Sequence, residues 1–132
     1  MFEALLKIVP LAADAFQWLL SRNEKEREQF GSLCDRIGEL LQSFAKASDD
    51  ERLSRNLCGE LKVYVPAIKA MAAPILEKNQ LTEMAQALSN VCDAWSRHSE
   101  NIGKRSYATS DLREIDTAGG HFRGLARLVR GM

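Results

Sequence analysis

The sequence predicts an all-α protein, an antiparallel up-down four-helix bundle with an additional hydrophobic N-terminal helix. Three observations predict this fold class. Apolar residues recur three and four residues apart almost from one end of the chain to the other, which is the period of an amphipathic helix. The two-residue alternation of strands is missing, and so are the Asn-Gly and Asp-Gly dipeptides of tight hairpins. The segments between the periodic stretches are short, so successive helices should pack antiparallel.

Length and charge narrow the class further. A chain of 132 residues suits a single domain, with 1–21 as the hydrophobic N-terminal helix and 23–132 as the amphipathic bundle. Its 18 basic and 18 acidic residues cancel, whereas a general nucleic-acid binder carries a basic excess. Hydrophobic residues make up 45% and charged residues 27% of the chain, as in ordinary soluble proteins. We therefore expect a soluble protein that binds no nucleic acid.

The first expected helix spans residues 2–21 and is apolar around most of its circumference. Its polar side chains fall within about 80° of one another at 100° per residue, and they are Glu3, Lys7, Asp14 and Gln17. Pro10 should kink the helix. The acidic side chains disfavour both a signal peptide and a membrane span. Because a helix that is hydrophobic all round is normally buried, we expect something to cover this one.

The second expected helix spans residues 23–46, with Asn23 as its N-cap. Its apolar positions follow the a/d spacing of a helix–helix seam. These expected core positions are Phe30, Leu33, Cys34, Ile37, Leu40, Leu41 and Phe44.

The third expected helix begins at a capping box formed by Ser48 and Glu51 and runs to about residue 75. Its apolar phase continues past Pro66, which predicts one helix with a kink near that proline. Its expected inward positions are Leu53, Leu57, Cys58, Leu61, Tyr64, Val65, Ile68, Met71, Ala72 and Ile75.

The fourth and fifth expected helices span residues 80–100 and 111–130. A turn at Lys78–Gln80 precedes the fourth, and a loop capped by Thr109 or Ser110 precedes the fifth. The inward positions of the fourth are Leu81, Met84, Ala85, Leu88, Val91, Cys92 and Trp95. Those of the fifth are Leu112, Ile115, Gly119, Phe122, Leu125, Ala126 and Val129.

Motifs of catalysis and metal binding are missing from the sequence. It contains no Glu-x-x-His or His-Glu-x-x-His motif for a metal, no glycine-rich phosphate loop and no Gly-x-Ser-x-Gly elbow. His98 and His121 alone do not make a closed site. Cys34, Cys58 and Cys92 form no Cys-x-x-Cys pair, so we expect buried reduced thiols in a cytoplasmic protein; a redox switch is the alternative. The sequence predicts no enzyme, no metal and no cofactor.

The fifth helix carries two features that suggest a contact surface. Gly120 and Gly124 lie one turn apart, although a helical glycine costs up to about 1 kcal/mol relative to alanine. They indicate a close approach of another helix, a helix break at residues 119–120, or a groove for a partner helix. Arg123 and Arg127 lie on one stripe, which either complements the helix dipole or contacts an acidic protein or lipid headgroups.

The hydrophobic first helix can be covered in three ways. The other four helices can surround it, a second copy or a partner protein can cover it, or it can leave the bundle and enter lipid. The second outcome makes the chain a non-catalytic interaction module: an adaptor, a regulator or an oligomerising domain. Its expected partner-binding residues are Phe2, Leu6, Val9, Trp18, Gly120, Gly124, Arg123 and Arg127.

The alternative function is a membrane-perturbing effector of cell death or defence. A hydrophobic N-terminal helix ahead of an amphipathic bundle is similar in arrangement to helical cell-death domains of the HeLo and coiled-coil type. That resemblance implies membrane contact through the first helix. However, this helix has one lysine and two acidic residues, whereas interfacial helices have a basic polar face. We therefore expect a protein partner or a homo-oligomer in preference to a membrane.

Overall fold

The computed structural model describes residues 5–7, 22–46, 51–74, 76–100 and 109–131, with the side chains of 51–54, 92–100 and 109–111 left aside. Four long helices lie in these ranges: α3 (Glu24–Lys46), α4 (Glu51–Ala72), α5 (Lys78–Glu100) and α6 (Thr109–Arg130). Residues 5–7 form a helical turn, and the described ranges contain no strand. The all-α prediction is confirmed. None of these helices has an apolar stretch that would cross a bilayer.

Helix α3 has the cap and the core that the sequence predicts. The Oδ1 atom of Asn23 accepts the Glu26 backbone N–H at 2.8 Å, and the Asn23 carbonyl accepts that of Arg27 at 3.1 Å. All seven expected core positions of this helix, from Phe30 to Phe44, are buried. The apolar seam therefore faces the core along the whole length of α3.

Helix α4 continues through Pro66 as one helix, as predicted. Four of its expected inward side chains are buried, and four more are partly buried against the core. The buried ones are Cys58, Leu61, Ile68 and Ala72, and the others are Leu57, Tyr64, Val65 and Met71. The expected cap at Ser48, the Leu53 side chain and Ile75 lie outside the described residues.

The predicted turn at Lys78–Gln80 is wrong, because these residues form the first turn of α5. The Gln80 side chain accepts the Glu77 backbone N–H at 3.0 Å, and the Glu77 carbonyl accepts the Leu81 N–H at 2.9 Å. A glutamine that reaches back to the residue three before it caps a helix start, so α5 begins earlier than its apolar pattern. Leu81, Met84, Leu88 and Val91 are buried as expected.

Helix α6 begins at Thr109 and passes through Gly119 and Gly120 without interruption. The helix break at residues 119–120, one of the three alternatives for the glycines, is therefore excluded. Thr109 and Ser110 belong to the helix instead of preceding it. The predicted seam of α6 is confirmed. Leu112 is partly buried, and the other six positions are buried: Ile115, Gly119, Phe122, Leu125, Ala126 and Val129. Ala118, which the sequence did not place in the seam, is buried as well.

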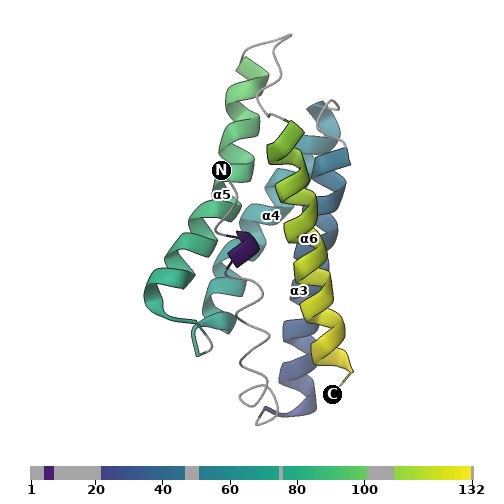
Figure 1. Ribbon diagram of the computed structural model, residues 1–132, viewed down its shortest axis with the longest axis vertical. Coiled ribbons are helices and arrows are strands. Elements are labelled where there is room, and N and C mark those ends of the chain that lie inside the picture. Colours follow the sequence, from purple (N-terminus) through teal and green to yellow (C-terminus); the bar gives the residue numbers. More distant parts are fainter. Residues whose placement is uncertain (1–4, 8–21, 47–50, 75, 101–108, 132) are drawn as a thin grey trace.

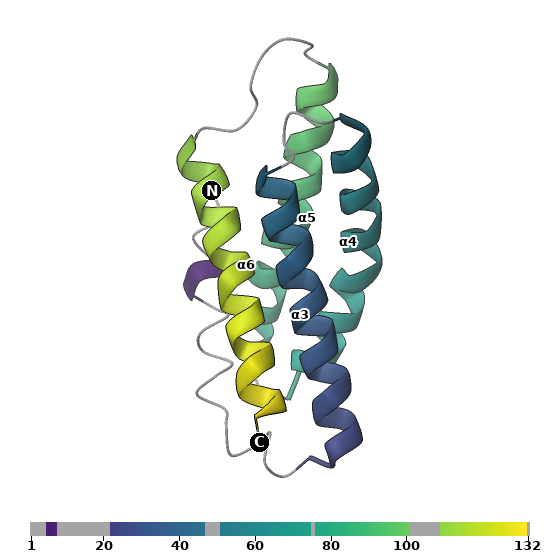
Figure 2. The same cartoon turned by 90° about the vertical axis from the view of Figure 1, so that its right-hand side faces the viewer.

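Helices α3 and α6 are the most closely packed pair, and both Figure 1 and Figure 2 show them side by side. A Cβ atom added to Gly38 would lie 2.6 Å from the carbonyl oxygen of Gly119, and one added to Gly119 would lie 2.8 Å from that of Gly38. Gly31 faces Ala126 and Arg130 in the same way. Rising residue numbers in α3 thus meet falling numbers in α6, so the two helices are antiparallel.

The close approach predicted at Gly120 and Gly124 is wrong in its position. Within 4 Å of a Cβ added at Gly120 there is only the Gln42 side chain, at 3.7 Å, and at Gly124 there is nothing. Both glycines are exposed. The neighbouring Gly119 makes the contact instead, because it lies on the buried side of α6.

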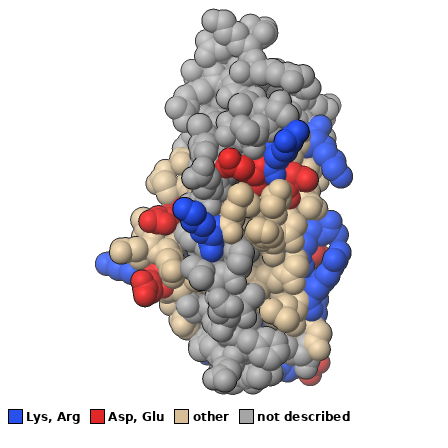
Figure 3. Space-filling view, viewed as in Figure 1, with Lys and Arg blue, Asp and Glu red and all other residues tan. Residues whose placement is uncertain are grey.

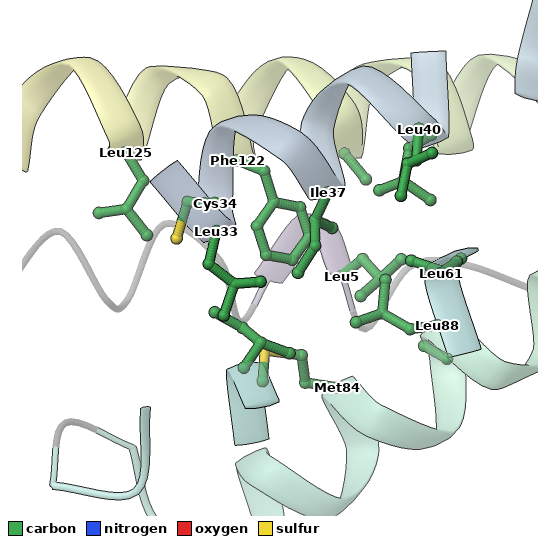
Figure 4. Close-up of a cluster of buried hydrophobic side chains, with 14 of the residues drawn as sticks. Leu5, Leu33, Cys34, Ile37, Leu40, Leu61, Met84, Leu88, Phe122 and Leu125 are labelled. Atoms are coloured by element: carbon green, nitrogen blue, oxygen red, sulfur yellow. The ribbon is translucent and has the colours of Figure 1, made fainter. Parts of the chain in front are cut away.

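The turn of residues 5–7 belongs to the core. Leu5 is fully buried, Leu6 is partly buried against the same cluster and Lys7 is exposed. Figure 1 draws the turn between α5 and α6, and Figure 4 shows the Leu5 side chain beside Ile37 and Leu88. At this point the chain's own helices cover the N-terminal segment.

Alanine substitution at Gly119 tests the α3–α6 contact. The new methyl group meets the Gly38 backbone, so Gly119→Ala should lower the free energy of unfolding by about 1–3 kcal/mol. The matched control, Gly124→Ala on the same helix, has open space and should raise it by about 0.5–1 kcal/mol. Urea unfolding measures both. Equal, stabilising effects of the two substitutions would contradict the contact.

Truncation of Leu5 tests the place of the N-terminal turn. Because Leu5 is fully buried, Leu5→Ala should lower the free energy of unfolding by about 2–5 kcal/mol. Lys7→Ala, two residues away and exposed, should leave it within about 0.5 kcal/mol. Thermal and urea unfolding check the pair. An unchanged midpoint for Leu5→Ala would show that the turn is not part of the core.

Candidate functional site

Helix α4 has a second apolar stripe on the side turned away from the core. We define this α4 outer face as Val63, Pro66, Ala67 and Ala70, which recur at the spacing of one helix side, together with Pro74 in the turn that follows the helix. Val63 is 71% exposed, against 38% for Leu128, the other exposed large hydrophobic of the described residues. All five residues are at least partly accessible and none is charged. The face is therefore an exposed apolar surface.

A groove runs along this face, between α3 and α4, which lie side by side in Figure 2. One part, of about 590 Å³, is lined by Leu33, Tyr64 and Ala67 among others, and the next part, of about 270 Å³, by Phe30, Ala70 and Pro74. Gln29 and Met71 line both parts, so we treat them as one feature, the α3–α4 groove. The lining also includes charged residues of α3, among them Lys25, Glu26, Arg27 and Glu28, so the groove combines apolar and charged surface.

An ion pair connects the two helices near the groove. The Arg36 guanidinium donates to both carboxylate oxygens of Glu60, through Nε at 2.7 Å and Nη2 at 2.8 Å, and through Nη1 to Glu39 at 2.9 Å. The Tyr64 hydroxyl also donates to Glu60 at 3.5 Å. These hydrogen bonds, to Glu60 above all, raise the pKa of Arg36. The charge of Glu60 is thus already matched by Arg36.

The opposite edge of the α4 outer face is basic. Residues 61–76 contain no acidic residue, and their two charged residues, Lys62 and Lys69, lie seven positions apart on one side of the helix. Both lysines are exposed. Among the described residues neither has an ion-pair partner. We call this pair the basic edge.

Sequence reasoning did not identify the α4 outer face. Apart from Val63, its residues are alanines and prolines, and Pro66 in a helical stretch predicts a kink and not a contact surface. The signal that could have found it is the spacing of Val63, Ala67 and Ala70 on the side opposite Ile68, within a stretch free of acidic residues. Two apolar stripes on one helix indicate two contact surfaces.

The structure separates the two predicted arginines. Arg123 is held by α3: its Nη1 donates to the Gln42 side chain at 2.9 Å, and its Nε lies 3.6 Å from an Asp35 oxygen. Arg130 likewise pairs with Glu28 at 3.4 Å and Asp35 at 3.7 Å. Arg127 is exposed, and basic side chains follow the edge of α6 in Figure 3. The interface with α3 therefore already uses part of the predicted arginine stripe.

The other predicted contact residues are not gathered at the α3–α4 groove. Leu6 is half-buried against the core, and Gly120 and Gly124 are exposed on α6. Phe2, Val9 and Trp18 lie outside the described residues.

Side chains able to bind a metal are dispersed in the described part of the chain, where no three or more His, Cys, Asp or Glu residues cluster. His121 is half-buried on α6, and the His98 and Cys92 side chains lie outside the described residues. Cys34 and Cys58 are buried free thiols. Burial, helped by the charge of Asp35, raises the pKa of Cys34 from 9.0 to about 12. Such a thiol is protonated at neutral pH and is a poor nucleophile.

Comparison with known proteins found no relative: no protein-family model, no curated protein and no solved structure matches the chain. On the described surface, the α4 outer face is exposed apolar area between the basic edge on one side and the α3–α4 groove, which contains charges of both signs, on the other.

Alkylation of Cys34 tests its protonation and burial. In a Cys58→Ala/Cys92→Ala variant, the shift from 9.0 to about 12 should leave roughly a thousandfold less thiolate at pH 8 in the folded chain than in urea. Iodoacetamide labelling followed by mass spectrometry measures the rates. The thiol ionises first in the unfolded chain, so Cys34 should lower stability only as the pH rises from 9 towards 12. Equal labelling rates in buffer and in urea would contradict the burial.

Proposed function

We propose that this chain is a non-catalytic helical interaction module that binds an amphipathic helix of a partner protein in the α3–α4 groove. One observation carries the proposal: a groove with apolar side chains from both α3 and α4 and charged ones from α3 lies beside a helix face that is exposed, apolar and uncharged. Docking an amphipathic helix into such a groove is a common mode of recognition. The binding surface is then on α3 and α4, and not on the N-terminal helix and α6.

The small residues of the α4 outer face support a helix as the ligand. Ala67 and Ala70 project little from α4, so the backbone of another helix can approach closely. The groove beside them has an apolar lining that includes Phe30 and Met71. Each square ångström of apolar surface removed from water contributes roughly 25 cal/mol, and covering Val63 alone would remove the most exposed large hydrophobic side chain of the described residues.

The proposed architecture is the antiparallel up-down four-helix bundle. The contacts of Gly38 with Gly119 and of Gly31 with Arg130 support an antiparallel α3–α6 pair. The Arg36–Glu60 pair and the groove lining of Phe30 with Met71 support an antiparallel α3–α4 pair. In this arrangement one side of each helix faces the core, and a second side of α4 is accessible to a partner.

Release of the N-terminal helix into lipid is the less favoured mechanism. It would have to extract Leu5, which is fully buried among the side chains of the four helices. Extraction of a buried leucine opposes release by an amount comparable to a core truncation, about 2–5 kcal/mol. A fixed surface on α4 needs no such rearrangement.

Selection from a displayed library of amphipathic helices tests the proposal without knowledge of the natural partner. Helices that bind the full chain should bind Ala67→Glu at least tenfold more weakly, because the carboxylate enters the apolar groove and loses its water. Thr117→Glu, an exposed position on α6, is the matched control and should keep the affinity within about twofold. Fluorescence anisotropy gives the dissociation constants, and circular dichroism confirms that each variant is folded.

Two outcomes would contradict the proposed function. The library could yield no binder, or its binders could bind Ala67→Glu and Val63→Glu as tightly as the unchanged chain. In either case the α3–α4 groove is not a docking site for a helix.

A further inference from the structure

The two edges of the α4 outer face differ in the sign of their charge. Lys62 and Lys69 form the basic edge, where neither has an ion-pair partner among the described residues. On the other side, Arg36 is bound to Glu60 and Glu39, and the α3 wall of the groove carries both signs of charge, from Lys25 and Arg27 beside Glu26 and Glu28. A ligand that covers the outer face therefore meets only positive charge along one edge and charges of both signs along the other.

From this asymmetry we propose that the partner helix carries acidic residues along one edge, seven positions apart, which pair with Lys62 and Lys69. This inference rests on the proposed function and specifies its partner. Residues seven apart on a helix lie on the same side and roughly 10.5 Å from each other along the axis. A glutamate or aspartate at i and i+7 of the partner, beside its apolar stripe, matches the two lysines in position and in sign.

A second copy of this chain fits the surface poorly. If two copies packed their outer faces about a two-fold axis with antiparallel α4 helices, the same edge of each helix would face the other. The basic edge of one copy would then lie against the basic edge of its mate. Lys62 and Lys69 would meet like charges, with no acidic residue between positions 61 and 76 to compensate.

A lipid surface also fits less well than a helix. Segments that lie in a membrane interface insert large side chains such as Trp, Phe and Leu below a strongly basic face. The α4 outer face offers Val63 as its largest aliphatic side chain, with alanines and prolines around it. Two lysines beside a face of mostly small residues suit a protein helix better than a bilayer.

The experiment reverses the charge of the basic edge and of the ligand. Helices selected from the library against the full chain should be enriched in Glu or Asp at positions i and i+7. They should bind Lys62→Glu/Lys69→Glu about fivefold to tenfold more weakly at low salt, because two exposed ion pairs are lost and replaced by repulsion. The same helices with lysine in place of the acids should prefer the variant.

A control variant with the same change of net charge distinguishes ion pairing at the basic edge from the effect of the protein's overall charge on affinity. Lys46→Glu/Arg127→Glu reverses two exposed basic residues on α3 and α6 and should change the affinity by less than about twofold at 150 mM salt. This control also probes Arg127, which the sequence placed in the contact surface.

Several results would overturn the inference. The basic edge is not recognised by charge if the selected helices lack acidic enrichment, or if they bind Lys62→Glu/Lys69→Glu as tightly as the unchanged chain. If Ala67→Glu still abolishes binding in that case, the proposed function survives. Binding of the full chain to phosphatidylserine vesicles that Lys62→Glu/Lys69→Glu abolishes would assign the edge to lipid. A dimer in sedimentation that Ala67→Glu dissociates would assign the face to a second copy.

Discussion

The backbones of α3 and α6 touch at Gly38 and Gly119, and the rest of the structure depends on this contact. Neither position has room for a methyl group, since each would meet the other's carbonyl oxygen. Because the helices are so close, Arg123 and Arg130 can lie across α3 and reach Asp35. These ion pairs are partly exposed, so they specify the register more than they add stability. The glycines let the backbones of α3 and α6 approach closely, and the ion pairs of the arginines favour one alignment of the two helices.

The position of the proposed binding surface follows from this pairing. One side of α3 packs against α6, and on another side Arg36 forms an ion pair with Glu60 of α4. Helix α4 then packs against α3 and α5 with one half of its circumference, and its other half has no neighbour among the described helices. A polar surface would be expected there in a monomer. The apolar residues found instead are the reason to propose a partner.

The sequence predicts features that are set within one helix, such as a cap or an apolar face, and misses features that depend on how two helices are aligned. The predictions of the Asn23 cap and of the seven core positions of α3 are confirmed, because a cap and an apolar period depend only on residues within one helix. The sequence could not separate Gly119 from Gly120 and Gly124, because the choice depends on which residues of α3, some 80 positions earlier, face them. It missed the cap of α5 because Gln80 acts through one side-chain hydrogen bond. It missed the α4 outer face because alanine and proline are ambiguous between core, kink and contact.

The most direct test of this account is the distance between the backbones of Gly38 and Gly119 in solution. Nuclear Overhauser effects between the Hα protons of these two glycines measure it in the unmodified full chain. The account predicts strong cross-peaks between them, together with cross-peaks from Gly31 to Ala126 in the same antiparallel register. Cross-peaks from Gly38 to Gly120 or Gly124 instead, or none between α3 and α6 at this level, would contradict the register on which the proposed surface depends.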